Sequence, residues 1–387
     1  MEPEILPPRP ESDEGSVIPQ ELTASEAELF APKPVEKHYL RWIFMGSEGL
    51  RAGWSVAIFI PITILLAMCI GRAFLMLHLI TKGAPVFTPT SAIFGELIGV
   101  LAILCAGALV ALIERRRNSV LAFNLTGPRP VFHFLTGLVA GFAALSELVA
   151  ALTLGGWMHF GPVGLTGADI ARYAALWGCA FLLVGCFEEG TFRCYLQFTL
   201  ARGINFWWAL GLVGAMCLDL LLTARGNGLW GVYVMALLGL APCLVLYLQK
   251  APGNGFWQAA WVTSTLFGFI HTGNNGENWI GIFGAAAIGF VFVVSIRVTG
   301  SAWWAIGCHA AWDWAETYFY GAADSGMVAT GHYLSVTPAG NPLWSGGTDG
   351  PEGSALILGI LVLLLVALVG IYGWRKPAAI STDLAAG

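Results

Sequence analysis

Apolar segments close to 20 residues long recur along most of this 387-residue chain. A helix needs about 20 such residues to cross a lipid bilayer. Charged residues make up 11% of the sequence, whereas a soluble protein has about 25%. The sequence therefore predicts an all-α, polytopic helical membrane protein with about ten transmembrane segments, about eight of them in the core. The segments are expected at 54–78, 93–113, 131–155, 173–199, 206–222, 229–248, 257–271, 279–297, 301–320 and 354–374.

The rest of the chain divides around these segments. Residues 1–37 are acidic and rich in Pro, which predicts a disordered N-terminal tail. Residues 38–53 resemble a short interfacial helix that leads into the membrane. The expected order after this is a core at 54–320, a non-cytoplasmic loop at 321–353, a C-terminal transmembrane helix at 354–374 and a cytoplasmic tail at 375–387.

Positive charge is distributed unevenly between the loops. If the N-terminus lies inside, the arginines at 115–117, Arg202, Lys250 and Arg375 fall on the cytoplasmic side, and the loop 321–353 has no Lys or Arg. This follows the positive-inside rule and predicts cytoplasmic termini. We expect a multi-pass protein of the cell inner (plasma) membrane. The lipid bilayer is an expected partner because of the apolar segments. No cluster of basic residues is longer than 115–117, so nucleic acid is not an expected partner.

Two adjacent carboxylates and a guanidinium, those of Glu188, Glu189 and Arg193, interrupt the apolar segment 173–199. Burying one charge near the bilayer centre costs about 2.5–3.5 kcal/mol, so such residues are functional candidates. In a helix Glu189 and Arg193 are i and i+4 and can form an ion pair, whereas Glu188 lies about 100° around the helix. We therefore expect Glu189 to be structural and Glu188 to be the free carboxylate, suited to a general base. The alternative is a buried salt-bridge cluster of all three residues without chemistry.

Polar side chains recur in two later apolar segments. His271 ends one of them, with Phe267 one turn earlier on the same face. His309 and Asp313 lie in the segment 301–320 at positions i and i+4, so both project from one face of the expected helix. Such a face can bind metal, relay protons or polarise a carbonyl group. The alternative for each position is a structural residue whose hydrogen bonds are satisfied.

A zinc site is another alternative. Glu188, His271 and His309 would supply two imidazoles and a carboxylate, which is a known zinc ligand set. The HExxH spacing that would favour this interpretation is absent from the sequence. We therefore expect no cofactor and no metal.

Three motifs follow one another on separate apolar segments: Glu-Glu-x-x-x-Arg, Phe-x-x-x-His and His-x-x-x-Asp. This order resembles the CPBP family of intramembrane glutamic endopeptidases, which includes CAAX prenyl proteases and bacteriocin-processing enzymes. The resemblance covers residues 170–320 well and 40–170 loosely. The matching positions are Glu188, Glu189, Arg193, Phe267, His271, His309 and Asp313.

The resemblance implies a metal-free protease with a water-accessible cavity between its helices. Glu188 would be the general base that activates water, assisted by His271. His309 and the residue at 313 would stabilise the oxyanion, while Glu189 and Arg193 would orient the site. Position 313 is often Asn in the family. We interpret Asp313 as an acceptor that orients His309 instead of a direct donor.

The predicted activity is hydrolysis of a peptide bond in a peptide or membrane-protein substrate. A CAAX-processing role would require prenylated substrates, so the broader substrate class is the expectation. One alternative is a non-catalytic scaffold or bacteriocin-immunity-type protein that retains the protease fold. A second is a proton-coupled transporter, although the sequence shows no inverted repeat of that kind.

Overall fold

The computed structural model describes residues 43–46, 49–81, 87–114, 125, 129–223, 228–250, 254–274 and 276–374. The predicted tails 1–37 and 375–387 lie outside the described residues. The chain forms two units, Met1–Phe44 and Met45–Gly387. All helices and strands of the bundle belong to the second unit.

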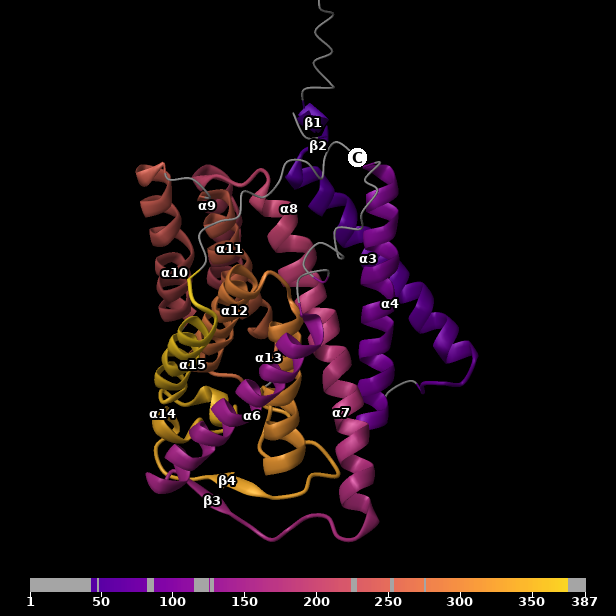
Figure 1. The fold of residues 1–387 in the computed structure, drawn as a ribbon, viewed down its shortest axis with the longest axis vertical. Coiled ribbons are helices and arrows are strands. Elements are labelled where there is room, and N and C mark those ends of the chain that lie inside the picture. The colour runs from indigo at the N-terminus through magenta and orange to yellow at the C-terminus, as the bar shows by residue number, and fades with distance from the viewer. Residues whose placement is uncertain are drawn as a thin grey trace, which may run out of the picture. The chain divides into compact units, whose positions relative to one another are not determined.

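A helix occupies each of the ten predicted segments (Figure 1). They are α3 (Ala52–Met76), α4 (Pro89–Ile113), α6 (Pro130–Leu154), α7 (Ala168–Glu189) with its continuations η1 (Gly190–Leu196) and α8 (Gln197–Ala201), α9 (Phe206–Thr223), α10 (Gly228–Gln249), α11 (Asn254–His271), α12 (Trp279–Thr299), α13 (Trp303–Asp313) with its continuation η2 (Trp314–Tyr320), and α15 (Ile357–Tyr372). The predicted class, an all-α polytopic membrane protein, is confirmed.

Seven helical spans in the described part of the chain are long and apolar enough to cross a membrane. This criterion of length and composition selects seven of the ten predicted segments. The three segments that fall short are α11, α13 with η2, and the shorter apolar helix α15. Polar side chains such as Gln258 and Ser264 are buried in α11, which packs against α9, α10 and α12. Because neighbouring helices surround it, α11 does not need the apolar exterior of a lipid-facing span.

Apolar side chains cover the outer surfaces of the spans. Met68 of α3 is 67% exposed and Val139 of α6 is 69% exposed. Side chains of this kind would be unfavourable in water in such numbers, but they suit contact with lipid tails.

Glycines allow α13 to pack very closely against α6 and α7. A Cβ atom at Gly141 of α6 would lie 2.0 Å from the carbonyl oxygen of Cys308, and one at Gly137 would lie 2.3 Å from that of Trp304. On the other side, a Cβ atom at Gly185 of α7 would lie 2.9 Å from the carbonyl oxygen of Ile306. Small residues four positions apart are typical of close helix pairs in membranes. This packing fixes the position of α13.

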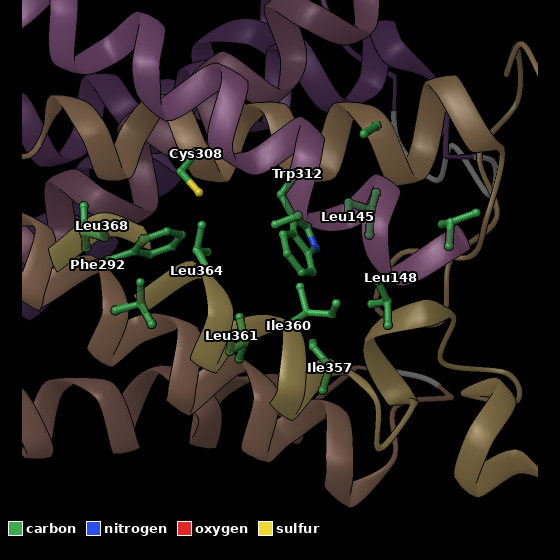
Figure 2. Packing of buried hydrophobic residues seen from close by; sticks show 14 of the residues in the cluster. Leu145, Leu148, Phe292, Cys308, Trp312, Ile357, Ile360, Leu361, Leu364 and Leu368 are labelled. Carbon is green, nitrogen blue, oxygen red and sulfur yellow. The ribbon is translucent and has the colours of Figure 1, made fainter. Parts of the chain in front are cut away.

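An apolar core joins α13 to the C-terminal helix α15. Trp312 and Cys308 are buried on α13, and Ile357, Ile360 and Leu364 face them from α15 (Figure 2). Burying aliphatic and aromatic side chains of this size stabilises a fold by about 1.5–3 kcal/mol each. The added C-terminal helix is therefore part of the bundle core.

Two segments contain short strands. Within 38–53, residues 38–42, 47 and 48 lie outside the described residues, Ile43 and Phe44 are helical, and β1 (Met45–Gly46) pairs antiparallel with β2 (Gly49–Leu50). Gly49 has a φ of +98°, which favours this tight reversal. The loop 321–353 is regular in part. It contains β4 (Val336–Pro338), which pairs with β3 (Met158–Phe160), and the short helices α14 (Pro342–Ser345) and η3 (Pro351–Gly353).

Candidate active site

A cavity of about 220 Å³ lies within the helical bundle. Five predicted site residues line it: Glu188 at the end of α7, Phe267 and His271 on the last turn of α11, and His309 and Asp313 on α13. A cavity of this size holds several water molecules. Folding therefore brings residues that are far apart in the sequence to one cavity that can hold water.

His309 is at the centre of the polar contacts. Its Nδ1 lies 2.9 Å from Oε1 of Glu189, and its Nε2 lies 3.7 Å from Oε2 of Glu188 and 3.5 Å from Oδ2 of Asp313. A carboxylate only accepts, so Nδ1–H donates to Glu189. Nε2 faces the two other carboxylates but makes no hydrogen bond of ordinary length to either of them.

Glu189 and Arg193 lie behind the cavity wall. Nε of Arg193 is 3.2 Å from Oε2 of Glu189, and the two side chains are 1% and 0% exposed. The guanidinium also lies 4.3 Å from the ring centre of Phe267 and 5.3 Å from that of Phe292. A cation between aromatic faces is stabilised by the ring quadrupoles. The ion pair expected from the i, i+4 spacing is therefore present, in an aromatic cage.

The interpretation of Asp313 as the residue that orients His309 does not agree with this geometry. The hydrogen bond to His309 comes from Glu189, while Asp313 stands on the cavity side at 3.5 Å. The i, i+4 spacing places Asp313 near His309, but the close approach of α7 at Gly185 brings Glu189 to Nδ1. A contact between helices cannot be read from the spacing within one helix.

His271 is oriented by its own helix. Its Nδ1 lies 2.7 Å from the carbonyl oxygen of Phe267. Since a carbonyl only accepts, Nδ1 carries a proton, and in the neutral imidazole Nε2 is then the atom with the lone pair. The Phe267 ring lies 4.8 Å from the imidazole ring, centre to centre, so Phe267 touches both His271 and Arg193. His271 can therefore accept a proton or a hydrogen bond.

The helical geometry changes directly after both pairs of candidate residues. α7 ends at Glu189 and continues as the π-helix η1, and α13 ends at Asp313 and continues as the π-helix η2. π-Helical turns are rare and occur frequently at functional sites. Arg193, inside η1, still reaches Glu189, although the sequence argument assumed an α-helix.

Three further carboxylates line the cavity that the sequence analysis did not assign to it: Glu96, Asp324 and Glu352. Glu96 is the only charged residue of the apolar helix α4, which is the signal that could have identified it. Asp324 and Glu352 belong to the segment between η2 and α15. Burial raises the pKa of the Asp324 carboxyl, and burial with the nearby Asp324 raises the pKa of Glu352 well above its usual range.

The proposed zinc ligands do not form a compact set. Among the residues that the structure describes, the group whose ligand atoms all lie within 4.8 Å of one another is Glu316, Asp324 and Glu352. Glu188, His271 and His309 do not meet this criterion.

Comparison with known families finds a similarity over part of the chain. The family described as type II CAAX prenyl endopeptidase Rce1-like matches residues 242–315. This stretch contains Phe267, His271, His309 and Asp313 and begins after Glu188. Over this stretch the match agrees with the family resemblance seen in the three motifs, and it supports, at the family level, a CAAX-type intramembrane protease. No curated protein and no solved structure matches the chain.

Proposed function

We propose that the protein is an intramembrane endopeptidase that hydrolyses a peptide bond with a glutamate-activated water. The observation that carries this proposal is the convergence of Glu188, His271, His309 and Asp313 on one buried cavity. A salt-bridge cluster without chemistry would need neither a water-sized space nor a second imidazole facing it.

Glu188 has the position of the general base. Its side chain is 23% exposed and lines the cavity, whereas that of Glu189 is fully buried and occupied by Arg193 and His309. Water held between Glu188 and Nε2 of His271 would transfer a proton to the Glu188 carboxylate as its oxygen attacks the substrate carbonyl carbon. The same proton then passes to the departing amine nitrogen, so Glu188 ends the cycle ionised.

His309 has the position of the oxyanion donor. A positively charged Nε2–H is a strong donor to the oxygen of a tetrahedral intermediate, because stabilisation is largest where charge develops. Glu189 fixes the ring through Nδ1, and Asp313 favours the imidazolium from the cavity side. Asp313 then acts through His309 and does not itself have to donate to the oxyanion.

The substrate class and the location are also proposals. The proposed substrate is a peptide or a membrane protein. The asymmetry of Lys and Arg between the loops supports the inner membrane with both termini in the cytoplasm. The proposed steps involve no metal ion.

The experiment is a comparison of membrane peptides from cells that carry the wild type or Glu188→Gln. Asp169→Asn is the matched control, because Asp169 is an exposed acid of the same helix with a side chain that is 58% exposed. Peptide products that disappear in Glu188→Gln, at equal protein levels, would support the protease. Products that persist in this variant would refute it, and an unchanged cellular phenotype would favour a scaffold or immunity-type protein. Solute flux in proteoliposomes that depends on Glu188, without cleavage by the wild type, would favour a transporter.

A further inference from the structure

A second group of acidic side chains lies beside the cavity. Glu316 of η2, Asp324 and Glu352 of η3 each place one carboxylate oxygen within 4.8 Å of the other two. Asp324 and Glu352 line the cavity wall, and Glu316 lies behind it. None of them is among the residues proposed for catalysis.

Glu316 makes this group more than a patch of negative charge. Its side chain is 0% exposed. Neither of its carboxylate oxygens has a hydrogen-bond partner among the residues that the structure describes. Burying an ionised carboxylate without a partner is very costly, so buried charges are normally paired or bound to a metal. Glu316 therefore requires a positively charged partner or a proton.

The other two carboxylates are held in place by one oxygen each. Oδ2 of Asp324 accepts a hydrogen bond of 2.7 Å from Oγ1 of Thr317, and Oε1 of Glu352 accepts one of 2.6 Å from Nε1 of Trp312. The second oxygen of each accepts no hydrogen bond from the described part of the chain. Two oriented carboxylates thus each offer an oxygen for a further ligand.

The backbone brings the three segments to one point. Gly350 has a φ of +109°, and a Cβ atom there would lie 2.0 Å from the carbonyl oxygen of Ala323 and 3.3 Å from Oε1 of Glu316. Only glycine fits such a close approach with a positive φ. The close spacing of the carboxylates is therefore imposed by the fold, against their mutual repulsion.

We propose that Glu316, Asp324 and Glu352 bind a divalent cation, with Ca²⁺ as the best fit. Two ligands of one ion lie at most two ion–ligand distances apart. Ca²⁺ takes oxygen ligands at about 2.3–2.6 Å, which allows separations of about 4.6–5.2 Å, whereas Mg²⁺ at about 2.0–2.1 Å allows about 4.2 Å. All separations up to the 4.8 Å bound are within reach of Ca²⁺, which also tolerates irregular ligand geometry. Zinc is disfavoured because the set has no nitrogen or sulfur ligand.

The cation would tie η2, the segment around Asp324 and η3 together, and so hold one wall of the cavity. This inference does not rest on the proposed protease activity, since none of the three ligands is asked to take part in hydrolysis. It adds a site whose ion is structural and separate from Glu188, His271 and His309.

Terbium luminescence provides the test, because Tb³⁺ replaces Ca²⁺ at oxygen sites and is excited by a nearby tryptophan. Trp312, which is hydrogen-bonded to Glu352, is the expected sensitiser. The full-length protein in detergent, first treated with chelator, should give a Tb³⁺ signal that Ca²⁺ displaces. Saturating Ca²⁺ should also raise the thermal unfolding midpoint by about 5 °C or more.

Glu316→Gln should weaken Ca²⁺ displacement of Tb³⁺ by at least about tenfold, since calcium affinity depends on the number of charged ligands. It should also stabilise the chelator-treated protein, because a neutral amide removes repulsion. Asp324→Asn serves as the second ligand variant if the first does not fold, and Asp169→Asn should behave as the wild type. Absence of a Ca²⁺-displaceable signal in the wild type overturns the proposal. So does binding that survives both ligand variants, or binding that is lost in Glu188→Gln instead.

Discussion

Nδ1 of His309 lies 2.9 Å from Oε1 of Glu189, which belongs to a different helix and precedes it by 120 residues. The other oxygen of Glu189 faces Nε of Arg193 at 3.2 Å. One fully buried carboxylate thus connects the aromatic cage of Arg193 to an imidazole that faces the cavity. Glu189 is a positioning residue, and its effects on stability and on catalysis should be separable.

Loss of the Glu189 carboxylate should destabilise the protein strongly. Glu189→Ala removes the anion that faces a buried guanidinium, and breaking a buried ion pair on one side costs about 3–5 kcal/mol. The free energy of unfolding in detergent, measured with a chemical denaturant, should fall by this amount. The control is Asp169→Asn, which breaks an ion pair with Arg172 in the same helix at 3.7 Å with side chains 58% and 68% exposed. An exposed pair contributes only about 0–1 kcal/mol, and equal losses in both variants would contradict the assignment.

Asp313→Asn should preserve proteolysis within about tenfold, while Asp313→Leu should reduce kcat by about 100-fold or more. An amide retains the size of the side chain and adds an N–H near the place where the oxyanion forms, whereas leucine removes every polar group. Because Asp313 acts on the charge of His309, the Asn variant should also change the pH profile of kcat. An Asn variant as inactive as Glu188→Gln would instead make Asp313 essential to the chemistry.

Much of the fold was predictable because lipid imposes a simple pattern. Each of the ten apolar segments is a helix, since long apolar runs have few alternatives. α11 falls short of the composition typical of a span, because its polar side chains pack among neighbouring helices instead of forming a lipid-like outer surface. Hydropathy along a sequence cannot distinguish these two environments when the segments are short.

The candidate site was predictable only as far as motifs and helical spacing reach. Glu188, His271 and His309 were found through polar residues in apolar segments, and they line one cavity. Asp324 and Glu352 were missed because they lie in a loop whose fold depends on contacts between distant segments, such as the pairing of β3 with β4. The hydrogen bond from His309 to Glu189 was missed because it also joins two helices that are far apart in the sequence.

Close packing of α6 on α13 should be essential to the site. Gly141→Ala would place a methyl group 2.0 Å from the carbonyl oxygen of Cys308, the neighbour of His309. We expect a loss of about 1–3 kcal/mol in the free energy of unfolding and a lower kcat, because α13 has to move. Gly211→Ala in α9 is the matched control, since no atom lies within 4 Å of its added Cβ. That variant should be neutral or slightly stabilising, and comparable damage by both would show that the packing is not responsible.

The free energy of unfolding should fall as pH rises from about 4 to 8. The cause is two carboxyl groups in the connections between helices, those of Glu277 and Asp349. Burial is the largest cause that raises the pKa of Glu277 to about 8, and the charge of Asp349 is the second. Burial is also the largest cause that raises the pKa of Asp349 to about 7. In the unfolded chain both groups ionise near pH 4. Between these values the folded state binds more protons than the unfolded state, so a rise in pH favours unfolding.

Glu277→Gln and Asp349→Asn imitate the protonated carboxyls and should reduce this dependence. The measurement is the thermal unfolding midpoint from pH 4.5 to 8.5 in the presence of chelator. Each variant should match the wild type near pH 4.5 and exceed it near pH 8. Asp169→Asn, at an exposed position, should give a curve parallel to that of the wild type. If the curves of Glu277→Gln and Asp349→Asn also remain parallel to the wild type across the whole range, these carboxyls do not retain their protons in the folded protein.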